Sequence, residues 1–238
     1  MKRVLALQHI WDDPPGYLGE IMQEYAIACD IVNVEEEAIP NLEGYAAIIS
    51  LGGAQHAYDD VNYPYFVPEK ALLRHVVERD IPFLGICLGG QLLASAMGAT
   101  VERHSITELG FFEVQLTEEG KTDPLFQGLP DGYQQVFHWH EDIFDIPPGG
   151  VKLATGYHAP NQAFRIGKRA YGIQYHIELT PAMLDTWLHF PDYMKEIVKV
   201  SGQEALEEIE RDRITRYPIF LEHSRIVFKN FLRMSGCS

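Results

Sequence analysis

The sequence predicts an α/β protein built on a mostly parallel sheet with helices on both faces. In the first hundred residues, strand-like apolar runs alternate with segments of helical spacing, as in βαβ units. Two of these runs, residues 45–53 and 81–87, are short and almost continuously apolar, which is typical of strands buried on both faces. With 238 residues and no long linker-like tract, the chain is expected to form a single domain.

The first half of the chain supplies the elements of this sheet in order. Within the segment 69–80, for example, Leu72, Leu73, Val76 and Val77 recur on one side of a helix. The predicted order is strand 3–10, helix 14–26, strand 29–34, strand 45–53, helix 69–80, strand 81–87 and helix 89–99. This order predicts a flavodoxin-like open sheet.

The second half of the chain is rich in strands and then becomes helical. Gly167 lies at the centre of the run Arg-Ile-Gly-Lys-Arg at 165–169 and predicts a hairpin turn. The segment from Pro181 onward has helical spacing. We therefore expect one domain over residues 1–190 and a helical extension over 191–238 packed on it. The predicted strands cover residues 108–120, 132–142, 151–157 and 162–176.

Charge and composition exclude several classes of function. The chain has 34 acidic and 19 basic residues, a net charge of −15, and no basic stretch of the kind that binds nucleic acid. No apolar run approaches the roughly 20 residues of a membrane-spanning helix, and the amino terminus lacks a signal-peptide cleavage site. Three cysteines without disulfide-like spacing indicate a reducing compartment. We expect a cytoplasmic protein that binds neither nucleic acid nor membrane.

The stretch GICLGGQ places Cys87 where a buried strand meets the start of a helix. Reactive groups gather at the carboxyl ends of strands in open α/β sheets. The three glycines permit a tight strand-to-helix turn, and the following helix aims free N–H groups at the thiol. The N–H of Leu88 is placed to hold a developing oxyanion. The pattern fits a nucleophile, and it equally fits a buried structural cysteine.

The stretch GIQYHIELT holds a candidate base and its partner. His176 and Glu178 are two residues apart on a strand-like segment, so both point to one face. Glu178 would then accept from one ring nitrogen while the other nitrogen faces a thiol. The alternative is that His176 is a core histidine and Glu178 lies at a solvated strand end. The presence of Cys87 upstream favours a Cys-His-Glu triad.

Four ordered motifs give the chain a family resemblance. The motifs are the elbow residues Gly85, Cys87, Gly89 and Gln91, the strand GIQYHIE at 172–178, the loop GGAQHAYD at 52–59 and the segment FHWHED at 137–142. Together they resemble the triad-type class I glutamine amidotransferase family, and within it the amidotransferase domain of GMP synthetase in a stand-alone form. The resemblance covers residues 1 to about 190.

The resemblance implies a fold, a reaction and a set of site residues. Cys87 would attack the side-chain amide of glutamine, with His176 as base and Glu178 as its orienter. The backbone N–H groups of Gly53 and Leu88 would form the oxyanion hole. The residues implied in substrate binding are Gly52, Gln91, His138, Trp139, His140 and Asp142.

The chain departs from the family pattern at several positions. Ala54 and Ile177 replace prolines, which alters the oxyanion loop and the turn after the histidine. The tripeptide 139–141 replaces Ser-His-Gly and changes the pocket for the α-amino acid group. For His140 and Asp142, the substrate rim and a structural role remain equal alternatives. Residues 56–59 are expected to form a capped turn.

Three functions remain open from the sequence. The first is hydrolysis of glutamine, with ammonia passed to a synthetase partner chain. The second is cleavage of small γ-glutamyl peptides, and the third is a non-catalytic binding or regulatory role. No phosphate-cradling glycine loop and no zinc-type ligand spacing occur, so we expect no cofactor and no metal.

Overall fold

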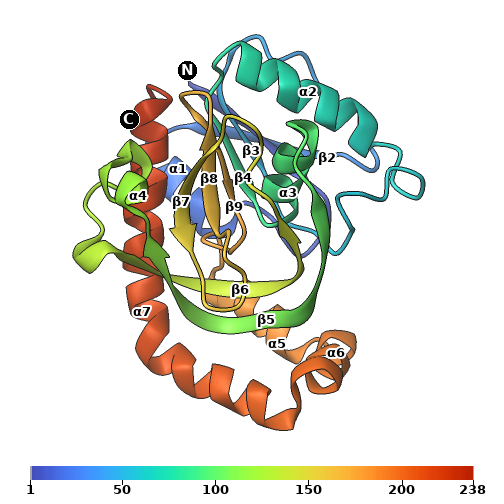
Figure 1. Cartoon of the computed structure of the whole chain (residues 1–238), viewed down its shortest axis with the longest axis vertical. Helices are drawn as coiled ribbons and strands as arrows, with labels where there is room; N and C mark the ends of the chain where they lie inside the picture. Colours follow the sequence, from blue (N-terminus) through green and yellow to red (C-terminus); the bar gives the residue numbers. More distant parts are fainter. Residues whose placement is uncertain (1, 238) are drawn as a thin grey trace.

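The computed structural model describes residues 2–237 and confirms the α/β prediction (Figure 1). Within these residues, nine strands form one sheet in the order β2-β1-β3-β4-β9-β8-β7-β5-β6. The strands from β2 to β9 in that order run parallel, and the remaining neighbours pair antiparallel. The parallel order is the flavodoxin-like one, with β9 as its last strand. The parallel strands are β1 (Arg3–Gln8), β2 (Ala28–Asn33), β3 (Tyr45–Ser50), β4 (Phe83–Ile86) and β9 (Ala170–Ile173).

Two apolar cores lie on the two faces of the parallel sheet. Consecutive residues of β1 enter different cores, Val4 one and Leu5 the other, because side chains alternate along a strand. The first core is covered by α1 (Gly16–Glu24) and the second by α2 (Phe66–Glu78) and α3 (Leu88–Ala96). The sheet is therefore covered by helices on both faces, as the sequence predicts.

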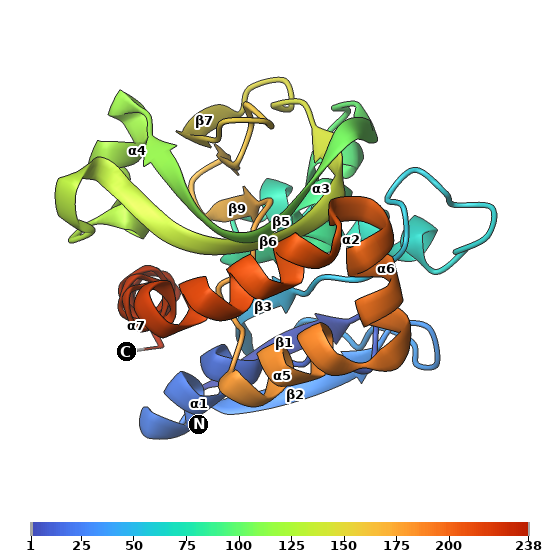
Figure 2. The ribbon, with the colours of Figure 1, turned by 90° about the horizontal axis from the view of Figure 1, so that it is seen from below.

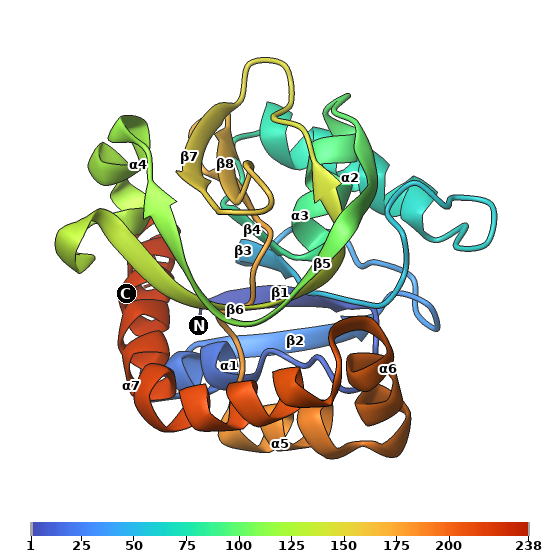
Figure 3. The ribbon, with the colours of Figure 1, turned by 60° about the horizontal axis from the view of Figure 1, so that its bottom comes forward.

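The second half of the chain adds a curved antiparallel layer. Figures 2 and 3 show β5 (Val101–Leu116) and β6 (Tyr133–Phe144) as a long bent ribbon beside the shorter strands β7 (Val151–Thr155) and β8 (Ala163–Ile166). The turn between β8 and β9 contains Gly167 at φ +64°, as predicted for the hairpin.

Most predicted boundaries differ from the structure by two or three residues, and one strand differs more. The strand expected over 108–120 begins earlier, at Val101, and ends at Leu116. It ends there because the Thr117 side chain accepts from the Gly120 N–H and caps a short helix, α4 (Glu118–Thr122). Two short 3-10 turns follow, η1 (Pro124–Phe126) and η2 (Pro130–Gly132).

The carboxyl-terminal helices pack on the rest of the molecule. They are α5 (Pro181–His189), α6 (Pro191–Ser201) and α7 (Gln203–Met234). The last turns of α7 place Phe228 and Phe231 in the same core as the sheet residue Val4. The division at residue 190 stays a prediction.

The buried end of α7 supplies a test of this packing. Phe228 has an exposed fraction of 0%, whereas Ile214 in the same helix is 80% exposed. Phe228→Ala is expected to lower the free energy of unfolding by about 3 to 5 kcal/mol, because it leaves a cavity in the core. Ile214→Ala should change it by no more than about 0.5 kcal/mol. Urea unfolding measures both; equal small effects would contradict the packing of α7.

Among the described residues, every helix is too short or too polar to cross a membrane.

Candidate active site

The carboxyl ends of three parallel strands bring predicted site residues together, and a fourth strand adds one that was not predicted. Gly52 and Gly53 follow β3, Cys87 follows β4, and His176 follows β9. The loop after β1 carries Asp13 to the same edge. This is the edge at which open α/β sheets bind ligands.

Cys87 occupies a strained turn between β4 and α3. Its φ is +49° and its ψ −107°, a conformation that residues with a side chain rarely adopt. The turn requires close backbone contacts: a Cβ on Gly89 would lie 2.1 Å from the Ser50 carbonyl oxygen, and a Cβ on Gly85 would lie 2.4 Å from the Gly89 oxygen. The Cys87 N–H donates to the Ile173 carbonyl at 2.9 Å, which ties the elbow to β9. The thiol position is thus fixed by two neighbouring strands.

His176 and Glu178 form a buried pair opposite the thiol. The His176 N–H donates to the Phe137 carbonyl at 2.8 Å, and its ring packs edge-on against Trp187 with centroids 4.9 Å apart. Nδ1 of the ring lies 2.5 Å from Oε1 of Glu178. The other Glu178 oxygen accepts from the Ile177 N–H at 2.7 Å. These contacts hold both the ring plane and its tautomer.

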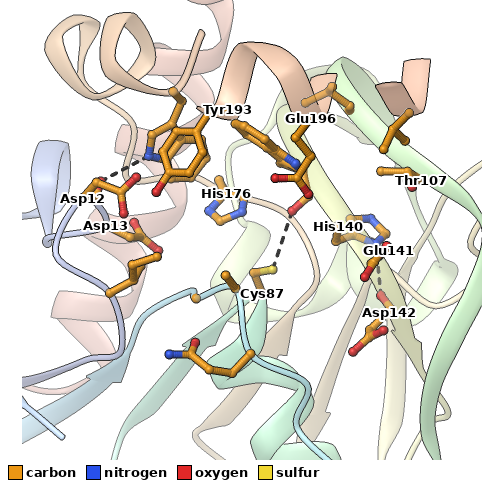
Figure 4. Close-up of a pocket in the computed structure, with 18 of the residues that line it drawn as sticks. Asp12, Asp13, Cys87, Thr107, His140, Glu141, Asp142, His176, Tyr193 and Glu196 are labelled. Carbon is orange, nitrogen blue, oxygen red and sulfur yellow. Dashed lines mark hydrogen bonds between the residues drawn. The ribbon is translucent and has the colours of Figure 1, made fainter. Parts of the chain in front are cut away.

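The remaining ring edge faces Cys87, and both side chains line one cavity (Figure 4). Burial alone would lower the pKa of His176, but the Glu178 charge and hydrogen bonds with Cys87 and Glu178 raise it well above its usual value. The Cys87 sulfur also contacts the Trp139 carbonyl at 4.0 Å and the Gln174 amide nitrogen at 3.9 Å. The arrangement suits a thiol that transfers its proton to the ring.

The cavity is lined by most of the predicted substrate residues. Gly52, Leu88 and His138 are not among the lining residues. Gly52 lies next to the His176 ring, since a Cβ at this position would be 3.0 Å from Cε1 of His176. The predicted residues that line the cavity with Cys87 and His176 are Gly53, Gln91, Trp139, His140 and Asp142.

The two predicted oxyanion donors have different surroundings. Leu88 is the first residue of α3, so its N–H has no acceptor within the helix. The loop at Gly53 lacks the family's proline but is held by Gln55, whose amide donates to the His9 carbonyl at 3.0 Å. Their role in binding an oxyanion stays a prediction.

The turn after this loop carries a contact that the sequence did not reveal. Asp59 accepts from the Asn62 N–H at 3.1 Å, so the capped turn is present. His56 Nδ1, in contrast, lies 2.8 Å from Asp142 Oδ2, and its ring stacks on Tyr58. The segment that follows β3 is thereby joined to β6 across the cavity.

A buried cluster supports the wall formed by β6. His140 Nε2 lies 3.0 Å from Glu108 Oε2 and 3.1 Å from His138 Nδ1. His138 therefore lies behind His140, and burial together with the charge of His140 keeps the pKa of His138 well below its usual value. His140 combines the two alternatives left open by the sequence, because it lines the cavity and belongs to this cluster.

The cluster predicts a pH dependence of stability. Burial opposes the charge of Glu108, but the His140 hydrogen bond, the charges of His138 and His140 and a bond from Gln162 lower the pKa of Glu108 to about 2. The pKa is about 4.3 in an unfolded chain, so the stabilisation is complete above that pH and is lost as the pH falls toward 2.

Glu108→Gln should therefore flatten the fall in the free energy of unfolding between about pH 5 and pH 3. The matched control is Glu102→Gln, an exposed position in the same strand. Urea unfolding across this range measures the effect. Parallel curves for Glu108→Gln and the native chain would contradict it.

Two groups of cavity residues escaped the sequence analysis. Asp12 and Asp13 come from the loop after β1, and Tyr193, Glu196 and other residues come from α6 (Figure 4). The sequence held one signal for the loop: two carboxylates directly after a predicted parallel strand. It held none for α6, whose residues reach the cavity only through tertiary packing.

Among residues 2–237, three side-chain clusters have ligand-type atoms within 4.8 Å of one another, and each already contains a hydrogen-bonded pair. The absence of a bound metal stays a prediction. The clusters are Glu108, His138 and His140; Asp13, His176 and Glu178; and His56, Glu141 and Asp142.

Comparison with known proteins places this site in a family. The family model "Glutamine amidotransferase class-I" matches residues 18–195. The chain is 28% identical over 198 residues to the putative glutamine amidotransferase-like protein YfeJ of Salmonella typhimurium, which covers 81% of each chain. It is 33% identical over 172 residues to the GMP synthase [glutamine-hydrolyzing] of Bacillus subtilis, covering 70% of this chain but only 31% of that protein.

Solved structures agree with the sequence comparison. A glutamine amidotransferase from Thermotoga maritima superimposes with a TM-score of 0.82 and 30% identity, covering 98% of this chain and 97% of the other. A glutamine amido transferase from Methylobacillus flagellatus gives a TM-score of 0.86 with 26% identity and covers 98% and 95% of the two chains. The family model matches more than half of the chain and the fold is shared with a solved relative, so the chain belongs to the class I glutamine amidotransferase family.

Proposed function

We propose that the chain hydrolyses the side-chain amide of glutamine through Cys87, His176 and Glu178. His176 takes the thiol proton, and the sulfur attacks the amide carbon. The oxyanion is held by the N–H groups of Gly53 and Leu88. The ring then gives its proton to the departing ammonia, and water hydrolyses the glutamyl thioester to glutamate. The observation that carries the proposal is the His176 ring, fixed by Glu178 at 2.5 Å and sharing a cavity with the elbow thiol.

The cavity offers groups for the amino acid end of the substrate. The Gln91 amide donates to the Asp142 carbonyl at 3.3 Å and to the Gln174 amide oxygen at 3.4 Å, which fixes its orientation. Oδ1 of Asp142 is buried without a hydrogen-bond partner, whereas Oδ2 is held by His56. An unpaired buried carboxylate oxygen is costly, and the α-ammonium of a glutamyl group would satisfy it.

A second candidate function is cleavage of small γ-glutamyl peptides. It is favoured by an apolar wall from α5 and α6 that includes Trp187, Tyr193, Ile197 and Val200. Ammonia leaves no group for such a wall to contact, whereas a substituent on the amide nitrogen would. The thiol chemistry is the same for both substrates.

Release of ammonia would call for a synthetase partner chain. The Bacillus subtilis GMP synthase extends well beyond the 31% of its length that aligns. In the proposed pairing, this chain supplies ammonia and another chain consumes it. A reducing cytoplasm suits a thiol nucleophile in a chain whose described cysteines are all free.

The test is steady-state release of glutamate from purified chain, with glutamine, asparagine and γ-glutamyl dipeptides as substrates. Glutamine hydrolysis with no turnover of asparagine supports the glutaminase. A dipeptide rate well above that of glutamine supports the peptidase. No turnover of any of them, with or without cell lysate, would contradict both and favour a binding protein.

A further inference from the structure

Asp13 is a buried carboxyl group that no step of the proposed reaction uses. Its exposed fraction is 1%, and neither side-chain oxygen has a hydrogen-bond partner. A charged carboxylate in that position would lose its hydration without forming a hydrogen bond in the protein, which is a large cost in free energy. A group of this kind in a folded protein calls for a specific explanation.

Asp13 lies beside the His176–Glu178 pair. Oxygen atoms of Asp13 and Glu178 and a ring nitrogen of His176 all lie within 4.8 Å of one another. A Cβ on Gly52 would lie 2.5 Å from Asp13 Oδ2 and 3.0 Å from His176 Cε1. Only glycine at this position therefore leaves room for Asp13 beside the His176 ring. The start of α1, which follows the Asp13 loop, is anchored to the same segment, since the Tyr17 N–H donates to the Glu178 carbonyl at 2.7 Å.

The surroundings decide which carboxyl group carries a proton. The ionisable groups that face Asp13 are Glu178, His176 and Asp12, and among these only His176 can be positive. His176 and the Ile177 N–H both donate to Glu178, whereas Asp13 has no donor. Burial and the Glu178 charge raise the pKa of Asp13 well above its usual value. A proton on Asp13 supplies the donor that two facing carboxylates lack.

We propose that Asp13 is a positioning residue: as a neutral acid it donates a hydrogen bond to Glu178 and holds the His176–Glu178 pair with a single negative charge behind the ring. This role rests on the proposed function of the triad. A second charge behind the ring would hold the proton on His176 more strongly. The ring would then release this proton to the departing ammonia more slowly.

Two substitutions of similar volume separate donation from charge. Asp13→Asn stays neutral and keeps an N–H that donates to Glu178, so glutamine hydrolysis should remain within about threefold of the native rate. Asp13→Leu fills the same space without a donor, and the rate should fall about 10- to 100-fold because the pair loses its fixed orientation. Thermal unfolding of both variants establishes that they are folded. Equal losses in both, or a native rate in Asp13→Leu, would overturn the proposal.

A titration of His176 reports the charge directly. In protein labelled with ¹⁵N-histidine, the His176 signals are assigned by their loss in His176→Ala. Asp13→Asn should leave the midpoint of the His176 titration unchanged, because one neutral group replaces another. A midpoint that moves to lower pH would show that native Asp13 is charged, and would overturn the proposal even if Asp13→Leu failed to fold.

The titration also separates this inference from the proposed function. If the chain hydrolyses none of the substrates but the midpoint is unchanged in Asp13→Asn, the neutral Asp13 is supported and the proposed glutaminase activity is contradicted. If the chain is active but the midpoint is lowered, the glutaminase activity is supported and the neutral Asp13 is contradicted.

Discussion

Cys87→Ala is expected to abolish the proposed glutamine hydrolysis, with a fall in kcat of at least about 10⁴-fold. The substitution removes the atom that would form the thioester, and no other described cysteine lies in the cavity. The fall in kcat for His176→Ala should be of similar size, because the nucleophile and the base act as a unit and the effects of removing them do not add. The double variant should therefore be no worse than either single one.

The matched control is Cys29→Ala. Burial and the charge of Asp30 raise the pKa of Cys29 to about 11, so its thiol is a poor nucleophile at neutral pH. Its removal should leave kcat and KM unchanged. Glutamate release by Cys87→Ala at a rate close to the native one would contradict the assignment of the nucleophile.

Gly89→Ala is expected to disrupt the fold around the elbow and lower the free energy of unfolding by about 4 kcal/mol or more. The added Cβ would lie 2.1 Å from the Ser50 carbonyl oxygen and 2.6 Å from its carbon, and neither backbone atom can move without displacing β3. Because β3 leads into the predicted oxyanion loop and Gly89 is part of the elbow, activity should be lost with stability.

Gly19→Ala in α1 is the matched glycine control. Its Cβ would meet only Pro15, at an ordinary 3.6 Å, and alanine favours a helix over glycine. We expect a gain of about 0.5 to 1 kcal/mol. Urea unfolding compares the two variants, and a Gly89→Ala protein as stable as Gly19→Ala would show that the turn is not as tight as described.

The placement of Cys87, His176 and Glu178 could be predicted from sequence because its signals are short-ranged. Cys87 is framed by glycines within a few positions, and His176 and Glu178 are two residues apart on an extended backbone. Local geometry thus specifies each part, and the parallel sheet brings the carboxyl ends of β4 and β9 together. The same rule explains why the fold class was predictable from alternating apolar runs.

The remaining cavity residues depend on contacts that no local pattern records. Asp13 meets Glu178 from a loop 165 residues earlier in the chain, with no periodic spacing to mark it. The α6 residues reach the cavity because α5 and α6 pack against β5 and β6, and their spacing predicts only an amphipathic helix. His138 and His140 share a strand face, but only the tertiary structure places one behind the other.

The central claim is that His176 activates Cys87 for attack on a glutamine-like carbon. The most direct measurement is peptide mapping after brief treatment with a glutamine-analogue chloroketone, since Cys29, Cys87 and Cys237 compete within one chain. We predict one label per chain, on Cys87, blocked by glutamine and formed about 100-fold more slowly in His176→Ala. Labelling of Cys29 or Cys237 at the same rate as Cys87, or an unchanged rate in His176→Ala, would contradict the account.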